Sequence, residues 1–175
     1  MAEKVTHGDS YTRSDESSRA EIAMGKAVIH AGDAGAGQAA KICNNMMLAI
    51  HMIGTCEGFT MAQKLGLDPQ VFYDIASISS GQSWSVTSYC PLPGVGPKTP
   101  ADNGYQGGFA TALMLKDVRL CVDEAKNLDV PHAVMSTVLD QWETTNTEFG
   151  GDSDFTAIVK MIEQRAGVTV GKRKP

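Results

Sequence analysis

The chain has 175 residues, of which 42% are hydrophobic, enough to fill the core of one domain. Its net charge of −5 and isoelectric point near 5.3 provide no broad positive field, which argues against binding to nucleic acid or to an anionic membrane. The four histidines are too scattered to suggest a metal site.

Both ends of the sequence differ in composition from its middle. Residues 1–23 are polar and contain too little apolar surface to offset the entropy of ordering, so we expect them to be disordered or foreign to the domain. The segment 27–30 predicts a short strand or an extended entry into the domain. Basic residues close the sequence, and we expect 166–175 to be a flexible tail. The helical domain is therefore expected to span 24–165.

The first half of this domain predicts two helices and a long connection. Residues 35–65 are apolar on nearly every side, which indicates a long buried helix. Asp68 followed by Pro69 is an N-cap signal for a second helix that ends near Ser79. Residues 82–108 hold four of the seven prolines and predict an irregular connection, of a kind that is often functional or mobile.

Helical periodicity returns in the second half, over 109–128, 131–147 and 153–165. No segment in the last 140 residues alternates convincingly like a strand. The predicted fold class is all-α, built around the one long buried helix.

The first candidate site lies at the start of the long helix. Gly37 allows a ligand or another backbone to approach closely, and Lys41 and Asn45, four residues apart, project from one helix face. An ammonium group near a helix N-terminus that also loses hydration releases its proton more readily, which suits acid–base exchange. Alternatively, Lys41 extends its charge into solvent and Asn45 satisfies a neighbour.

Two further segments contain polar or aromatic residues in unusual places. Phe109, Leu113, Lys116 and Leu120 fall on one helical stripe, so Lys116 stands where a core residue is expected. It could bind a ligand, or pair with a neighbouring carboxylate such as Asp117. Trp84, beside several hydroxyls, could form the wall of a small polar pocket or simply anchor the connection to the core.

Three stretches resemble a known family: GDAGAGQAAKICNNM, SSGQSW and YQGGFATALMLKDVRL, in that order and spacing. They are similar to the β-hydroxyacid dehydrogenases, and in particular to the 3-hydroxyisobutyrate dehydrogenases. The resemblance covers residues 24–163. It implies the helical C-terminal domain of that family, of the type found in 6-phosphogluconate dehydrogenase, without the Rossmann domain that binds most of the cofactor.

The resemblance also implies a role for each candidate residue. Lys41 would be the catalytic lysine that transfers the proton of the substrate hydroxyl, while hydride passes to NAD. Asn45, Gly37 and Trp84 would bind the substrate. Lys116, Phe109 and Asp117 would face the cofactor.

The implied function is NAD-dependent oxidation of a short 3-hydroxy acid, as in valine degradation, by a homodimer or higher oligomer. Alternatives are reduction of tartronate semialdehyde, a dimerisation domain without catalysis, or an inactive fragment. The four cysteines show no paired spacing and are interpreted as reduced core thiols. No secretory signal or membrane-length apolar segment is apparent, so we expect the cytoplasm or, in a eukaryote, the mitochondrial matrix.

Overall fold

The computed structural model describes residues 29–171. Regular structure in this range is helical, without a strand, apart from an isolated bridge between Ala110 and Asp154. The all-α prediction is confirmed. The chain divides into two compact units, Met1–Asn44 and Asn45–Pro175, and the division falls inside helix α2 (Ala36–Lys64). The predicted leader lies outside the described residues.

The described part of the first unit is short. Ile29 and His30 have no regular structure, while residues 27 and 28 of the predicted strand lie outside the described range. The amide of Ala36 donates to the carbonyl of Asp33 at 3.0 Å, closing a turn that leads into α2. Gly35, with φ of 91°, occupies the left-handed region that favours glycine at this entry.

Helix α2 confirms the long helix predicted over 35–65, but within the second unit its burial is one-sided. Its buried apolar side chains recur every three or four residues and are Ala49, Met52, Ile53, Cys56, Phe59 and Ala62. Met47 and Met61 on other faces are 53% and 63% exposed. The described residues therefore leave part of the apolar surface of α2 uncovered.

Helix α3 (Pro69–Ala76) starts as predicted, with the Asp68 carboxylate accepting from the amides of Gln70 and Val71 at 2.9 and 3.1 Å. It ends at Ala76, three residues earlier than expected. The connection that follows is more ordered than its composition suggested. It contains α4 (Trp84–Thr87) and a 3-10 helix, η1 (Pro100–Asn103), which Thr99 and Asp102 close with a capping box.

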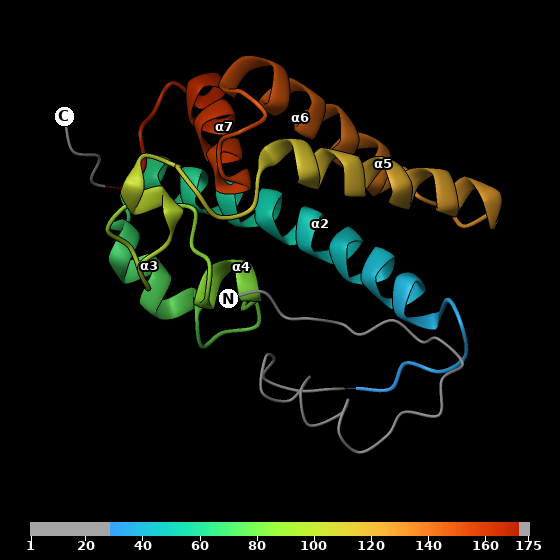
Figure 1. The fold of residues 1–175 in the computed structure, drawn as a ribbon. Helices are drawn as coiled ribbons and strands as arrows, with labels where there is room; N and C mark the ends of the chain where they lie inside the picture. Colours follow the sequence, from blue (N-terminus) through green and yellow to red (C-terminus); the bar gives the residue numbers. More distant parts are fainter. Residues whose placement is uncertain (1–28, 172–175) are drawn as a thin grey trace. The chain divides into compact units, whose positions relative to one another are not determined.

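Helices α5 (Thr111–Asn127) and α6 (Ala133–Phe149) form a hairpin and lie side by side, as Figure 1 shows. Both were predicted to within about two residues at each end. The N-terminal end of α5 comes later than expected because Phe109 pairs with another segment: its carbonyl accepts from the amide of Phe155 at 2.8 Å.

The last predicted helix appears as a 3-10 turn, η2 (Phe155–Ala157), followed by α7 (Ile158–Ala166), which packs on α6. The flexible tail was predicted to begin at residue 166, but the packed structure continues beyond that residue. Val170 is fully buried, and its amide donates to the Glu163 carboxylate at 2.6 Å. The packed domain therefore extends to at least Val170, because Gly167 takes a left-handed conformation that turns the chain back after α7.

The core of the second unit forms where α5, α6, η2 and α7 meet. Its largest fully buried side chains include Trp142, Tyr105, Phe59, Phe155, Met52, Leu92, Met114, Ile158 and Met161. Burial of each large apolar side chain contributes about 1.5–3 kcal/mol to the free energy of unfolding. This cluster is therefore the main stabilising feature of the unit. In residues 29–171, no helix combines the length and the apolar character needed to cross a membrane.

Candidate functional site

A polar network joins α2 to α5 inside the second unit. The Asn45 amide donates from Nδ2 to Oδ2 of Asp117 at 2.7 Å, and the Lys116 ammonium lies 2.9 Å from the other oxygen, Oδ1. The Asp117 side chain is 9% exposed, whereas that of Lys116 is 56% exposed. A nearly buried carboxylate thus fixes the plane of the Asn45 amide and holds a solvent-facing cation beside it.

The other two candidates on α2 belong to the first unit. Lys41 is exposed and lies four positions before Asn45 along the same helix, while Gly37 is buried. Cys43 is also exposed, which corrects the interpretation of all four cysteines as core thiols. Cys56, Cys90 and Cys121 are buried as expected. Burial raises the pKa of the Cys90 thiol to about 11.

The predicted core stripe on α5 is wrong. Leu113 and Leu120 are each 48% exposed, and Phe109 precedes the helix. The core face of α5 is instead formed by Met114, Leu115, Val118, Cys121, Val122 and Ala125. Lys116 therefore replaces no core residue. It lies on the open side of the helix, and its ion pair with Asp117 is the alternative that the sequence left open.

Trp84 and Phe109 belong to a second group, an aromatic cluster around Phe155. The Trp84 ring stacks on Tyr89 with centroids 4.8 Å apart, and Tyr89 lies 5.4 Å from Phe155. Phe109 meets Phe155 edge to face at 5.7 Å. Phe155 is 1% exposed and Trp84 is 43% exposed. The cluster therefore holds two accessible rings on a rigid buried base.

The Asp154 carboxylate is the polar centre of this cluster. Its Oδ2 accepts from the Tyr89 hydroxyl at 3.0 Å and from the Phe109 amide at 2.9 Å. Its Oδ1 accepts from the amide of Thr156 at 3.0 Å, which caps η2, and from the Thr156 hydroxyl. Burial of the phenol, and then the charge of Asp154, raise the pKa of Tyr89 well above its usual range.

A family model described as NAD-binding of NADP-dependent 3-hydroxyisobutyrate dehydrogenase matches residues 35–162, which is more than half of the chain. The chain belongs to the 3-hydroxyisobutyrate dehydrogenase family. The match includes both the polar network and the aromatic cluster with its Asp154 centre. The resemblance carried by the three sequence stretches is confirmed at the level of the family.

Two curated relatives and one solved structure illustrate the family likeness. Human mitochondrial 3-hydroxyisobutyrate dehydrogenase is 41% identical over 141 residues, which are 81% of this chain and 42% of that protein. A probable 3-hydroxyisobutyrate dehydrogenase of Mycobacterium bovis is 40% identical over 82% of this chain and 48% of its own. The Mycobacterium tuberculosis enzyme, solved with L-serine, has a TM-score of 0.76 and 36% identity over 89% of this chain and 53% of its own. The chain therefore spans about half the length of these relatives.

Asp154 and Tyr89 were missed by the sequence reasoning. Asp154 carried one usable signal, because an aspartate two residues before a threonine at the start of an apolar helix is a possible N-cap. That signal predicts the contact with Thr156 but not the contacts with Tyr89 and Phe109. Tyr89 carried no local signal, because its partner lies 65 residues away in the sequence.

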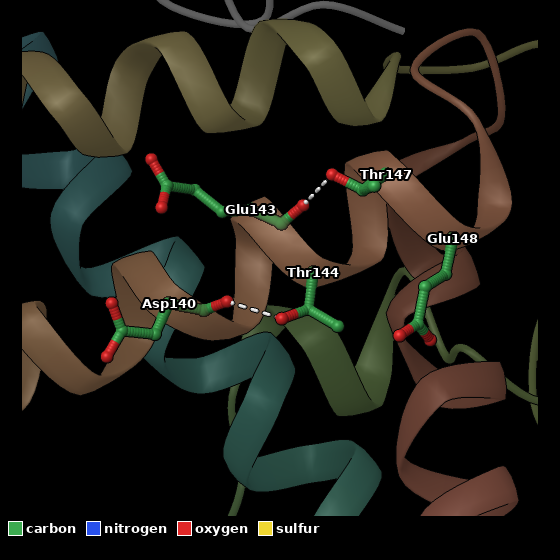
Figure 2. Close-up of a pocket in the computed structure, with 5 residues that line it drawn as sticks. All are labelled: Asp140, Glu143, Thr144, Thr147 and Glu148. Atoms are coloured by element: carbon green, nitrogen blue, oxygen red, sulfur yellow. Dashed lines mark hydrogen bonds between the residues drawn. The ribbon is translucent and has the colours of Figure 1, made fainter.

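A depression of about 420 Å³ over α6 is lined by none of the predicted site residues (Figure 2). Its lining comprises Asp140, Glu143, Thr144, Thr147 and Glu148. The two threonine hydroxyls donate to helix carbonyls, and the Asp140 and Glu148 carboxylates point in different directions. Glu143 binds Arg119 at 2.9 Å. This depression is a solvated acidic helix face rather than a converging site. In residues 29–171, no cluster of three or more metal-binding side chains occurs.

Proposed function

We propose that the chain supplies the helical part of an NAD-dependent dehydrogenase that oxidises 3-hydroxyisobutyrate, or another short 3-hydroxy acid, to its semialdehyde. The observation that carries this proposal is the network of Asn45, Asp117 and Lys116, within a region that matches the family over 35–162. The network supports the proposal because the nearly buried Asp117 carboxylate holds the Asn45 amide and a solvent-facing ammonium beside each other.

In this proposal Lys41 takes the proton of the substrate hydroxyl. Its exposed position on α2 leaves the ammonium accessible to a ligand, and Asn45 follows one helical turn later. Asp117 orients the Asn45 amide, which then binds the carboxylate or hydroxyl region of the substrate. Gly37 allows close approach of the ligand, and Trp84 walls the pocket.

The chain's residues fit part of a dinucleotide cofactor. Bound NAD would accept the hydride from the carbon that carries the hydroxyl group. Lys116 offers an accessible cation, Phe109 a partly buried apolar ring, and Asp117 holds Lys116 in place. Residues 29–171 contain no strand and hence no βαβ unit to bind the diphosphate. The fit is therefore to one side of the cofactor, with the remainder bound elsewhere.

The proposed organisation follows the same reasoning. The described residues 29 to about 170 belong to the helical domain, which would associate with a nucleotide-binding domain and form a homodimer or higher oligomer. Exposed apolar side chains on α3, such as Val71 and Ile75 at 51% and 52%, are available for such contacts. We propose that the protein acts in the cytoplasm or, in a eukaryote, in the mitochondrial matrix. Tartronate semialdehyde reduction remains a candidate for the substrate test.

The test begins with the purified 175-residue protein. NAD and NADP are titrated separately, with reduction of each followed by absorbance in the presence of 3-hydroxyisobutyrate. Tartronate semialdehyde is assayed in the reducing direction. If the protein alone is inactive, its residues 35–162 replace the matched region of the Mycobacterium tuberculosis enzyme, whose remaining half supplies the nucleotide-binding part. Absence of activity in both forms would contradict the proposal.

Lys41→Ala is the decisive variant in whichever form is active. We expect turnover to fall about 10²- to 10⁴-fold, the usual contribution of a positioned proton-transfer group. Lys64→Ala is the matched control, because Lys64 is another exposed lysine on α2. Near wild-type turnover of Lys41→Ala would refute the assigned role. Equal losses in both variants would indicate a general effect of charge on α2.

A further inference from the structure

The aromatic cluster has one feature that packing alone does not explain. A single oxygen atom, Oδ2 of Asp154, accepts from two donors that lead to different accessible rings. One donor is the hydroxyl of Tyr89, whose ring stacks on Trp84. The other is the backbone amide of Phe109. The position of both rings therefore depends on the same buried atom.

The segment that leads into Phe109 contains three residues with a positive φ, one of which is not a glycine. Tyr105 has φ of 65°, an uncommon value for a residue other than glycine, and Gly107 and Gly108 have φ of 82° and 72°. A Cβ at Gly108 would collide with Asp154, Tyr89 and Pro100. Backbone of this kind persists where surrounding contacts determine it, and such conformations gather at functional sites. Here the amide of Asp154 also binds the Tyr105 carbonyl at 2.8 Å.

We propose that Asp154 is a positioning residue: through Oδ2 it holds Phe109 and, by way of Tyr89, Trp84 in the orientation in which these rings line the ligand site. The role of the two rings in ligand binding rests on the proposed function. Asp154 itself is fully buried, so it would act through these neighbours and not by direct contact with a ligand. Its two oxygens have separate tasks, because Oδ1 binds only Thr156 and stabilises the start of η2.

This division between the two oxygens provides a matched set of variants. Tyr89→Phe keeps the ring but breaks its link to Oδ2, and leaves the link to Phe109. Asp154→Asn disturbs both links. Thr156→Val is the control, since it keeps the side-chain shape and removes a hydroxyl that binds Oδ1 alone. All three are measured in the full 175-residue protein at neutral pH, with far-ultraviolet circular dichroism to verify the fold.

Two readouts separate positioning from general stability. Trp142 is fully buried and Trp84 is 43% exposed, so acrylamide quenching of tryptophan fluorescence reports mainly on Trp84. Chymotrypsin cleavage after Phe109, identified by mass spectrometry, reports local opening of the segment before α5. We expect Tyr89→Phe to increase quenching without faster cleavage, and Asp154→Asn to increase both. For each readout that increases, we expect the population of the open form to rise about fivefold. This is the effect of losing about one hydrogen bond.

Thr156→Val should lower the melting temperature while leaving quenching and cleavage at wild-type values. If Tyr89→Phe leaves quenching unchanged, or if Thr156→Val changes both readouts as strongly as Asp154→Asn, the carboxylate has only a structural role and the proposal is refuted. Should Asp154→Asn fail to fold, the contrast between Tyr89→Phe and Thr156→Val still decides the outcome.

An activity measurement then tests the link to ligand binding. In an active sample, Tyr89→Phe should raise KM for the hydroxy acid about fivefold, with kcat within about twofold, since a misplaced wall weakens ground-state and transition-state binding alike. An unchanged KM beside increased quenching would refute the ligand-site part of the proposal. If the wild type shows no activity in any form, the proposed function fails, and the quenching and cleavage results still decide the positioning role of Asp154.

Discussion

Asp117 and Asp154 are both buried carboxylates, but they differ in the kind of partner that each holds. Asp117 binds a side-chain amide and a lysine that is 56% exposed, so its surroundings open toward solvent. Asp154 is fully buried and binds neutral donors only, from a tyrosine, a threonine and two backbone amides. The first arrangement leaves polar groups accessible to a ligand. The second fixes the framework on which accessible rings are placed.

The largest expected effect follows from replacing each carboxylate by its amide. Asp154→Asn places an amino group against donors that it cannot accept from, so we expect a loss of about 3 kcal/mol in the free energy of unfolding. Asp117→Asn should cost only about 1 kcal/mol, because solvent screens the exposed Lys116 partner. Urea unfolding followed by circular dichroism at pH 7 measures both. Equal losses would show that the two carboxylates are not distinct in the way their partners suggest.

A pair of adjacent glycines tests how tightly the Asp154 side is packed. Gly107 and Gly108 both have positive φ, but a Cβ at Gly107 meets nothing within 4 Å, whereas one at Gly108 lies 2.7 Å from Pro100 and closer still to Asp154 and Tyr89. Gly107→Ala should therefore show only the backbone cost of about 1–2 kcal/mol. Gly108→Ala adds overpacking and should cost about 1–3 kcal/mol more.

Thermal unfolding of the two alanine variants provides the measurement. A similar melting temperature for both would mean that the segment can shift to accommodate the methyl group, and that Phe109 is less firmly held than its contacts indicate. No such pair of glycine variants can test the packing around Asp117, because no glycine in the described residues packs against that carboxylate.

The sequence predicted the helices well because their signals are local. The Asp68-Pro69 start of α3 and the periodicity of α5 and α6 each lie within one helical turn or repeat. The predicted core stripe on α5 was wrong because the choice of core face depends on contacts with segments that are distant in the sequence. Which apolar stripe becomes the core depends on the segments that pack against α5, among them α6 and η2, and the buried face is that of Met114 and Val118 rather than that of Leu113 and Leu120.

The candidate site shows the same limit more strongly. Lys116 and Asp117 are neighbours, so their ion pair could be considered from the sequence. The bond between Asn45 and Asp117 joins residues 72 positions apart and was not predicted, because the resemblance implied only that one residue faces the substrate and the other the cofactor. The contacts of Asp154 with Phe109 and Tyr89 span 45 and 65 positions, and neither pattern nor resemblance pointed to them. Hydrogen bonds between a buried carboxylate and neutral donors far away in the sequence leave no local pattern from which they could be predicted.

The smallest expected effect concerns alkaline pH and distinguishes the two carboxylates once more. Burial of the phenol, and then the charge of Asp154, raise the pKa of Tyr89. The hydrogen bond described for Asp117 comes from Asn45 and involves no tyrosine. The unfolded chain releases the phenol proton near pH 10, while the folded protein keeps it, so the unfolded state binds fewer protons above that pH. The contribution is complete below about pH 10, and above it the free energy of unfolding falls by less than about 1.4 kcal/mol per pH unit, because solvent screens the partly exposed phenol.

Urea unfolding between pH 9 and pH 11 measures this slope. Tyr89→Phe removes the proton and should flatten the fall, even though its stability at pH 7 is lower by one hydrogen bond. Tyr73→Phe, on α3, is the control for loss of a phenol away from Asp154. The thiol of Cys90, with its pKa raised to about 11, adds a loss that is common to all three proteins and cancels in the comparison. Identical slopes for Tyr89→Phe and wild type would mean that the phenol is solvated, and that the bond on which the placement of Trp84 depends is not maintained in solution.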